Sequence, residues 1–332
     1  MSLTEHSQTG STQQQSIPPE STPPERPPSH GRSFAHRHGF SDLGLSLFWM
    51  VGAFFLFQIA GLVAAITLLM IFGDPATLLE GDPTAVLQDQ AKFLFAGNSI
   101  GQIAFLGVAT WAVTRWHLGA DDRRSWYLRL YQSQGVLKGS ALAALAFIVV
   151  QPIVWASGWL NGLIPVPESF EALQASQLEM IQSYISQEGS LGLALFHIAV
   201  VPAICEEVLF RGYLLRSFER STSTWMAVLL SGALFGLYHL QLTNILPLAL
   251  LGVAMGAITV ATGSIIPAMV AHFINNAGAV LLVRFAPDSP MVQMGTETPP
   301  PLLYIIVSVI GTLILGRMFL NHYKRAQSHA II

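Results

Sequence analysis

The chain has 332 residues, of which 52% are hydrophobic and only 11% are charged. A soluble domain carries about 25% charged residues, so this composition excludes an ordinary soluble enzyme and is typical of an integral membrane protein. The formal net charge of −3 identifies no partner, and no feature indicates binding to nucleic acid. The single cysteine, Cys205, excludes an intrachain disulfide. Because an apolar setting keeps a thiol unreactive, we interpret Cys205 as a small core residue and not as a nucleophile.

The first part of the chain, residues 1–40, is rich in Ser, Thr, Gln, Pro and His, with Pro-Pro pairs at 18–19, 23–24 and 27–28. This stretch offers no apolar face that could pack against a core. We therefore predict a disordered tail.

From Leu43 onward the chain contains long apolar runs, and a membrane span needs about 20 mainly apolar residues. The runs are 44–73, 93–114, 136–160, 191–216, 224–240, 246–262, 265–284 and 302–321, of which the fifth and sixth are short. The sequence therefore predicts an all-α polytopic membrane protein with about eight transmembrane helices. We divide it into N-terminal membrane helices with a surface segment (41–190) and a membrane core that would hold the chemistry (191–325).

The connecting segments predict the orientation of the spans. Residues 166–188 mix apolar residues with Glu, Gln and Ser, which indicates an amphipathic helix on the surface. Basic residues concentrate in the tail, in the second loop and after the fourth and eighth spans, whereas the first and third loops are acidic. By the positive-inside rule both termini face the cytoplasm. A compact multi-pass chain of this kind suits the inner membrane of a bacterial cell.

Charged residues inside the fourth apolar run are the most informative feature of the sequence. Glu206, Glu207 and Arg211 lie in this run, and a charge within a membrane helix is costly enough that it usually serves a function. Residues four apart share a helix face, so Glu207 and Arg211 are expected to form a supporting ion pair. Glu206 is rotated about 100° away, and a buried unpaired carboxylate suits a general base or acid.

Two later apolar runs add polar groups. Phe235 and His239 are four residues apart, as are His272 and Asn276, so the members of each pair share a helix face. Acid, imidazole and amide groups on three separate helices predict a buried active site. We expect Asn275, which points away from this stripe, to be a packing residue.

Other polar residues fit the site less well. His197 lies about half a turn out of phase with Glu206, so we assign it no role in the site. Asn98 and Gln102 share a face of the second span, which favours contacts between helices.

The three motifs, in this order along the chain, resemble those of the CPBP family of intramembrane proteases. They are Glu206-Glu207-Val-Leu-Phe-Arg211-Gly212, Phe235-Gly-Leu-Tyr-His239 and His272-Phe-Ile-Asn-Asn276. The family includes the CAAX prenyl endopeptidase of the second type and bacterial relatives linked to bacteriocin immunity and abortive infection. The resemblance covers residues 190–285, about a third of the chain, and no motif position departs from the family pattern.

The resemblance implies a role for each matching residue. Glu206 would be the base that activates the attacking water, and His239 would help to position that water. His272 and Asn276 would donate hydrogen bonds to the oxyanion of the tetrahedral intermediate. Peptide hydrolysis needs these parts, namely a base, a held water and donors aimed at developing negative charge.

The involvement of a metal is left open by the residues themselves. Glu206, His239 and His272 are candidate ligands for Zn²⁺ or another divalent metal, and family members are often described as metalloproteases. The chain lacks the His-Glu-x-x-His motif, and a glutamate mechanism that needs no cofactor fits the same residues. We favour the metal-free mechanism.

The depth of His239 is the one feature that does not fit a simple bundle. Counting about 1.5 Å per residue from the cytoplasmic ends, Glu206 and His272 lie about 12–15 Å deep, but His239 lies about 25 Å deep. They can meet only if the fifth span starts in the cytoplasm or the short fifth and sixth spans form a tilted hairpin. The residues 241–247, which include Asn244 and Pro247, are typical of a turn that could form that hairpin.

The function favoured by the sequence is therefore an intramembrane endopeptidase in the lipid bilayer. Its substrate would be a membrane-anchored protein or peptide, with a prenylated CAAX-like protein as one candidate. The alternatives are a transporter or channel whose charged residues line a pathway, and a catalytically silent membrane scaffold. A transporter is expected to show paired broken helices in two related halves, whereas here the polar motifs occupy one half.

Overall fold

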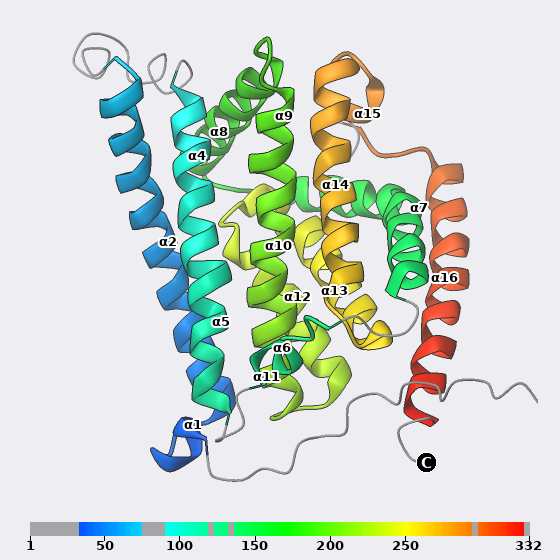
Figure 1. Ribbon diagram of the computed structural model, residues 1–332. Helices are drawn as coiled ribbons and strands as arrows, with labels where there is room; N and C mark the ends of the chain where they lie inside the picture. Colours follow the sequence, from blue (N-terminus) through cyan, green and yellow to red (C-terminus); the bar gives the residue numbers. More distant parts are fainter. Residues whose placement is uncertain (1–32, 75–89, 119–122, 132–135, 294–297, 329–332) are drawn as a thin grey trace, which may run out of the picture.

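The computed structural model describes residues 33–74, 90–118, 123–131, 136–293 and 298–328, which form a bundle of helices (Figure 1). In this part of the chain seven helices are long and apolar enough to cross a membrane. They are Asp42–Phe72, Ala91–His117, Val136–Gly162, Leu191–Glu219, Leu242–Thr262, Ile266–Phe285 and Leu302–Asn321. The prediction of an all-α polytopic membrane protein is confirmed.

Two sequence predictions concern segments that the structure does not describe, or describes only in part. Residues 1–32 of the predicted tail and 75–89 of the acidic first loop lie outside the described residues. The last part of the predicted tail contains a short helix, α1 (Phe34–Arg37), whose N-cap Ser33 accepts a hydrogen bond from the backbone of His36.

The first three spans are α2, a composite helix and α7. Helix α2 (Asp42–Phe72) begins at the N-cap Ser41. The second span runs through α4 (Ala91–Gly101), η2 (Gln102–Ala109), α5 (Thr110–Val113) and η3 (Thr114–His117). After α6 (Arg124–Tyr127) follows α7 (Val136–Gly162), which contains Pro152 and bends near its middle in Figure 1. An internal proline removes a helical hydrogen bond, which explains the bend.

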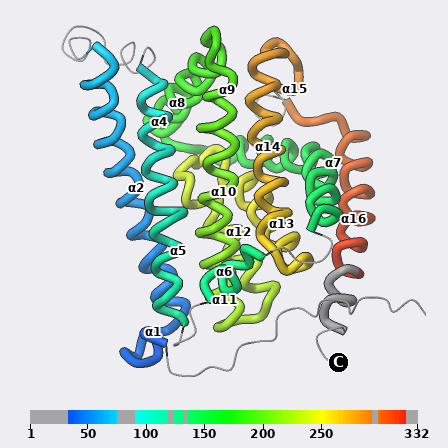
Figure 2. Tube along the Cα trace, in the orientation of Figure 1, coloured from blue at the N-terminus to red at the C-terminus, as the bar shows by residue number. Residues whose placement is uncertain are grey.

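The remaining elements complete the bundle. The predicted amphipathic segment is α8 (Glu168–Ser186), largely exposed. The fourth span consists of α9 (Leu191–Ala194), η4 (Leu195–Val200), α10 (Val201–Glu207), η5 (Val208–Leu214) and α11 (Leu215–Glu219). It is followed by α12 (Thr224–Tyr238), η6 (Leu242–Asn244), α13 (Ile245–Thr262), α14 (Ile266–Phe285), α15 (Pro290–Gln293) and α16 (Leu302–Ser328). Figure 2 shows that α16 runs toward the end of the bundle at which α1 lies.

Among the described residues seven helices, and not eight, are long enough to cross a membrane, because the fifth predicted span is short. Helix α12 has only 15 residues, too few to cross a hydrocarbon core that needs about 20. Figure 1 shows α12 rising from the end of α11 and α13 returning toward the same end of the bundle. The two helices therefore form a hairpin, one of the two arrangements that the depth of His239 requires.

The tip of this hairpin is held by Asn161, near the end of α7. Its Nδ2 donates to the carbonyl of Leu242 at 2.8 Å, and its Oδ1 accepts from the backbone of Leu246 at 2.8 Å. Backbone groups of a turn at membrane depth need such partners, because lipid offers none. Asn161 thus makes the interruption between α12 and α13 tolerable within the bundle.

The two helices of the hairpin approach each other through glycines. A Cβ atom on Gly252 would lie 2.8 Å from the carbonyl oxygen of Gly232, and one on Gly236 would lie 2.7 Å from that of Ile245. Small residues permit such close backbone packing between membrane helices.

We predict that Gly252→Ala forces α12 and α13 apart and lowers both the melting temperature in detergent and the activity. An overpacked core position costs about 1–3 kcal/mol. Gly278→Ala on α14 is the matched control, since a Cβ there would meet nothing within 4 Å. Equal melting temperatures for the two variants would contradict the close packing.

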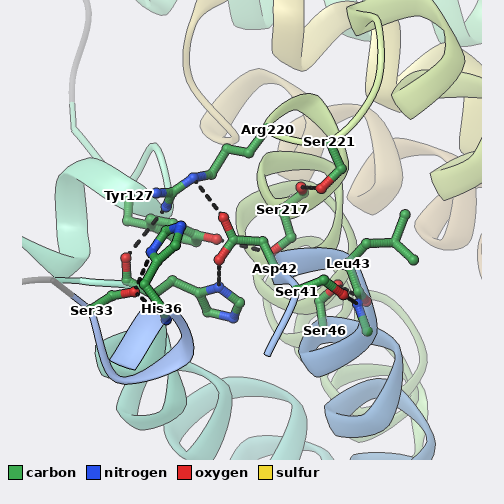
Figure 3. A network of polar contacts seen from close by, with 12 residues as sticks. Ser33, His36, Ser41, Asp42, Leu43, Ser46, Tyr127, Ser217, Arg220 and Ser221 are labelled. Atoms are coloured by element: carbon green, nitrogen blue, oxygen red, sulfur yellow. Dashed lines mark hydrogen bonds and ion pairs between the residues drawn. The ribbon is translucent and has the colours of Figure 1, made fainter. Parts of the chain in front are cut away.

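A polar cluster at the α1 end, buried at His117 and exposed at Arg220, ties the fourth span to the first. Asp42 Oδ1 lies 2.7 Å from His117 Nδ1, and Asp42 Oδ2 lies 3.0 Å from Arg220 Nε (Figure 3). The other ring nitrogen of His117 lies 2.9 Å from the hydroxyl of Tyr213, in η5. Asp42 thus accepts from one residue of the second span and one at the end of the fourth, so the cluster links these helix ends to α2.

Tyr127 of α6 extends the same region. Its hydroxyl lies 2.9 Å from the Oγ of Ser217 in α11. Burial raises the pKa of Tyr127 to about 12, so the hydroxyl keeps its proton at neutral pH. The short helix α6 is thereby attached to the fourth span.

Candidate active site

The two acidic residues end α10 and are both buried. Glu207 and Arg211 have no exposed side-chain surface, and their closest N and O atoms are 3.0 Å apart. The predicted ion pair is therefore formed. The NH2 group of Arg211 also donates to the carbonyl of Gly252 at 3.0 Å, which links the fourth span to the hairpin.

Glu207 has a second partner that the sequence pattern did not reveal. Its Oε1 also lies 2.9 Å from Nδ1 of His272, on α14. A carboxylate only accepts hydrogen bonds, so Nδ1 of His272 carries the proton. The ion pair therefore also fixes the ring of His272.

His239 caps the end of α12, and its ring is fixed in a similar way. Its Nδ1 lies 2.8 Å from the carbonyl oxygen of Phe235, so this nitrogen too is the donor. In the neutral rings of both histidines the Nε2 atoms then carry lone pairs. This tautomer is assigned from the hydrogen-bond partners.

Both free Nε2 atoms face the same oxygen. Nε2 of His239 lies 3.8 Å and Nε2 of His272 lies 3.9 Å from Oε2 of Glu206. This Oε2 is buried and has no hydrogen-bond partner among the described residues. Distances slightly beyond a direct hydrogen bond suit a bridging water. The structure thus brings together three of the four predicted site residues from α10, α12 and α14.

Asn276 lies one turn beyond His272 on α14. Its Nδ2 donates to the carbonyl of Ile198 at 2.9 Å, and its Oδ1 accepts from Asn275 at 3.0 Å. The interpretation of Asn275 as a packing residue that points away from Asn276 is therefore wrong. Side-chain torsions turn its amide toward the neighbouring residue, which a helical-wheel argument based on Cα positions does not capture.

The ring of Phe235 lies between the guanidinium of Arg211 and the imidazole rings of His239 and His272. The guanidinium carbon of Arg211 lies 4.4 Å from the centre of its ring, a cation–π contact. The ring centres of His239 and His272 lie 4.8 Å and 5.8 Å away, respectively. The motif residue Phe235 therefore packs against three polar residues of the site.

Three residues to which we assigned no catalytic role are buried or half-buried. Nδ1 of His197 lies 2.7 Å from the hydroxyl of Ser99, in a contact between the second and fourth spans. Gln102 is buried. Cys205 is a buried free cysteine, as a core residue would be.

The donor set can be compared with what a metal requires. Imidazole Nε2 atoms whose Nδ1 atoms donate to an acceptor, together with a carboxylate, are chemically suitable ligands for Zn²⁺. In the described part of the chain, however, no three His, Cys, Asp or Glu side chains are grouped so that they could hold a metal ion. We therefore derive no catalytic step through a metal.

Comparison with known families supports the assignment of this region. Residues 188–278 match the family model described as Rce1-like, type II CAAX prenyl endopeptidase Rce1-like. The match spans all three motifs, so the resemblance inferred from them is confirmed for this segment. Neither a curated protein nor a solved structure matches the chain.

Proposed function

We propose, on the premise that residues 188–278 form a type II CAAX prenyl endopeptidase Rce1-like domain, that the protein is an intramembrane endopeptidase. It would hydrolyse a peptide bond of a membrane-anchored protein or peptide, with a prenylated CAAX-like protein as the substrate class. The observation that supports this most strongly is the approach of two imidazole Nε2 atoms to one buried carboxylate oxygen, Oε2 of Glu206.

In the first step Glu206 acts as the general base for the attacking water. A water bound between Oε2 of Glu206 and Nε2 of His239 donates one hydrogen to each, which leaves a lone pair for the scissile carbonyl carbon. Glu206 takes the proton as the carbon–oxygen bond forms, and the carbonyl oxygen becomes the oxyanion. Glu206 then gives this proton to the amine nitrogen as the peptide bond breaks. Proton and electron pairs balance without a covalent enzyme intermediate.

His272 and Asn276 of α14 stabilise the oxyanion that forms in this step. His272 must first take up a second proton from solvent; its Nδ1–H then stays on Glu207, and its Nε2–H donates to the oxyanion. Asn276 supplies a further donor from the next turn of α14. Donors held in place before the reaction are worth most in a site that excludes water, and the buried pair of Glu207 and Arg211 supplies that rigidity.

An apolar groove next to the site fits a substrate that carries a hydrocarbon chain. It has a volume of about 160 Å³ and lies between α2 and α12, where Phe54, Leu237 and Tyr238 contribute to its lining. Tyr238 directly precedes His239, so a chain lying in this groove would come close to the imidazole from the bilayer side. Most binding sites for apolar ligands are concave and largely apolar.

The proposal predicts cleavage of a defined probe. The full chain in liposomes is given an internally quenched peptide that ends in a farnesylated CAAX sequence, and the unprenylated peptide serves as the matched control. We expect cleavage of the farnesylated probe, with a single site identified by mass spectrometry. Intact, correctly inserted protein that cleaves neither peptide would contradict the proposed substrate class.

The same assay separates the two forms of the mechanism. Because the steps above use only side chains of this protein, activity is expected to persist after dialysis against 1,10-phenanthroline. Loss of activity that Zn²⁺ restores would show that a metal activates the water, with Glu206, His239 and His272 as its first candidate ligands.

A further inference from the structure

A row of amide groups leads from α7 to the site. Nε2 of Gln151 donates to the backbone carbonyl of Phe147 at 3.0 Å and to Oδ1 of Asn275 at 3.0 Å. Nδ2 of Asn275 donates to Oδ1 of Asn276 at 3.0 Å, and Nδ2 of Asn276 donates to the carbonyl of Ile198 at 2.9 Å. We call Gln151, Asn275 and Asn276 the amide relay.

Both ends of the amide relay determine its direction. Phe147 and Ile198 offer backbone carbonyl oxygens, which can only accept hydrogen bonds. Each end therefore requires an NH₂ group to face it. Reversing any one amide would place oxygen against oxygen or NH₂ against NH₂. Since the orientation of a side-chain amide is read from its partners, the relay permits a single arrangement.

The carbonyl oxygen of Ile198 is free to accept a hydrogen bond from Asn276 because of a proline four residues later. In a regular α-helix it would accept from the backbone N–H of residue 202, but that residue is Pro202, which has none. The fourth span adapts through the π-helical segment η4, immediately before α10. Proline thus leaves an acceptor on the fourth span that Asn276 uses.

The arrangement leaves Asn276 with one donor for another group. Its Nδ2 carries two hydrogens, and the bond to Ile198 uses one of them. One turn earlier on α14, Nε2 of His272 faces Glu206. We propose that Gln151 and Asn275 are positioning residues that hold the amide of Asn276 with its NH₂ group on the side of Ile198, so that its second N–H can serve the substrate carbonyl oxygen.

This inference rests on the proposed function, because it assigns Asn276 a donor role in peptide hydrolysis. A purely structural role for the relay would make a different prediction. Hydrogen bonds between membrane helices contribute modestly to stability. A packing contact would therefore lower the melting temperature slightly and leave the ratio of the variant's kcat to that of wild type independent of pH.

Gln151→Glu tests the direction of the relay. An ionised carboxylate at position 151 can only accept a hydrogen bond. The side-chain amide of Asn275 must therefore rotate so that its NH₂ group donates to the carboxylate. The amide of Asn276 must then rotate as well, so that its NH₂ group donates to Oδ1 of Asn275. Asn276 then presents oxygen where it presented NH₂. We expect kcat to fall about 10²–10³-fold, as for the loss of one oxyanion donor, with KM changed less than about twofold. Gln151→Met removes the donor without introducing an acceptor, so its kcat should fall less.

The dependence on pH provides the decisive readout. A protonated carboxyl at position 151 donates to Oδ1 of Asn275 as the glutamine does, and this restores the original direction. The kcat of Gln151→Glu relative to wild type should therefore rise as the pH falls, whereas that of Gln151→Met should stay constant. Gln102→Glu, which introduces the same carboxyl at a buried glutamine outside the relay, is the control and should also show no such rise.

A second measurement does not depend on a substrate. With ¹⁵N-asparagine label in detergent, the side-chain amide signals of Asn275 and Asn276 should shift together in Gln151→Glu and return at low pH. If wild type fails to cleave the probe but these signals respond, the relay holds and the proposed function is wrong. If wild type cleaves and Gln151→Glu and Gln151→Met share one pH profile, the relay is only a packing contact.

Asn275→Asp covers the case in which Gln151→Glu does not insert stably. An ionised carboxylate at position 275 accepts from Gln151 and also from Asn276, so it reverses Asn276 in one step. The same fall in kcat with unchanged KM, and the same recovery at low pH, are expected. Activity equal to wild type at all pH values would overturn the proposal.

Discussion

Glu206→Gln should abolish peptide hydrolysis while the helical bundle remains folded. Glu206 supplies the oxygen that lies 3.8 Å and 3.9 Å from the two imidazole Nε2 atoms. Glutamine keeps the shape of the side chain, but it cannot accept a proton from water. General-base catalysis contributes about 10²–10⁴-fold, so the initial rate of probe cleavage should fall by at least that range.

Stability should barely change in this variant. The new NH₂ group faces the lone pair on Nε2 of His239, which can accept a hydrogen bond, so the buried position gains a suitable partner. Glu179→Gln, at an exposed position on α8, is the matched control and should keep full activity. Cleavage by Glu206→Gln at the wild-type rate would remove Glu206 from the mechanism.

Glu207→Ala and Arg211→Ala should cause the largest losses of stability. Both side chains are completely buried and lie 3.0 Å apart. Removing one partner leaves a buried charge unpaired, which costs about 3–5 kcal/mol. The melting temperature of the purified protein in detergent measures this loss, and Arg317→Ala, at an exposed position on α16, is the control.

The two variants should differ in activity. Arg211→Ala leaves the contact of Glu207 with His272, whereas Glu207→Ala also removes the acceptor that holds Nδ1 of His272. The activity per folded molecule should therefore be lower in Glu207→Ala than in Arg211→Ala. A double substitution to methionine removes both charges and should recover part of the stability without the activity. Wild-type melting temperatures for both single variants would contradict the role of the pair.

The sequence by itself determined the parts of the structure that depend on short distances along the chain. Apolar runs of about 20 residues form helices because lipid leaves backbone groups no other partners. The pair of Glu207 with Arg211 followed from a spacing of four residues, which one helix turn brings together. The three motifs also carried enough information to identify the family that residues 188–278 match.

Only the tertiary structure decided how these parts meet. The contact of His272 with Glu207 joins residues 65 apart, and that of Gln151 with Asn275 joins residues 124 apart. The periodicity of a single helix says nothing about such pairs, because they depend on how helices cross and rotate against one another. The same holds for α12, whose 15 residues read as a span until Asn161 and the glycine contacts fold it into a hairpin with α13. The turn residues 241–247 allowed this hairpin as one of two arrangements, and only the tertiary structure shows that it brings His239 to Glu206.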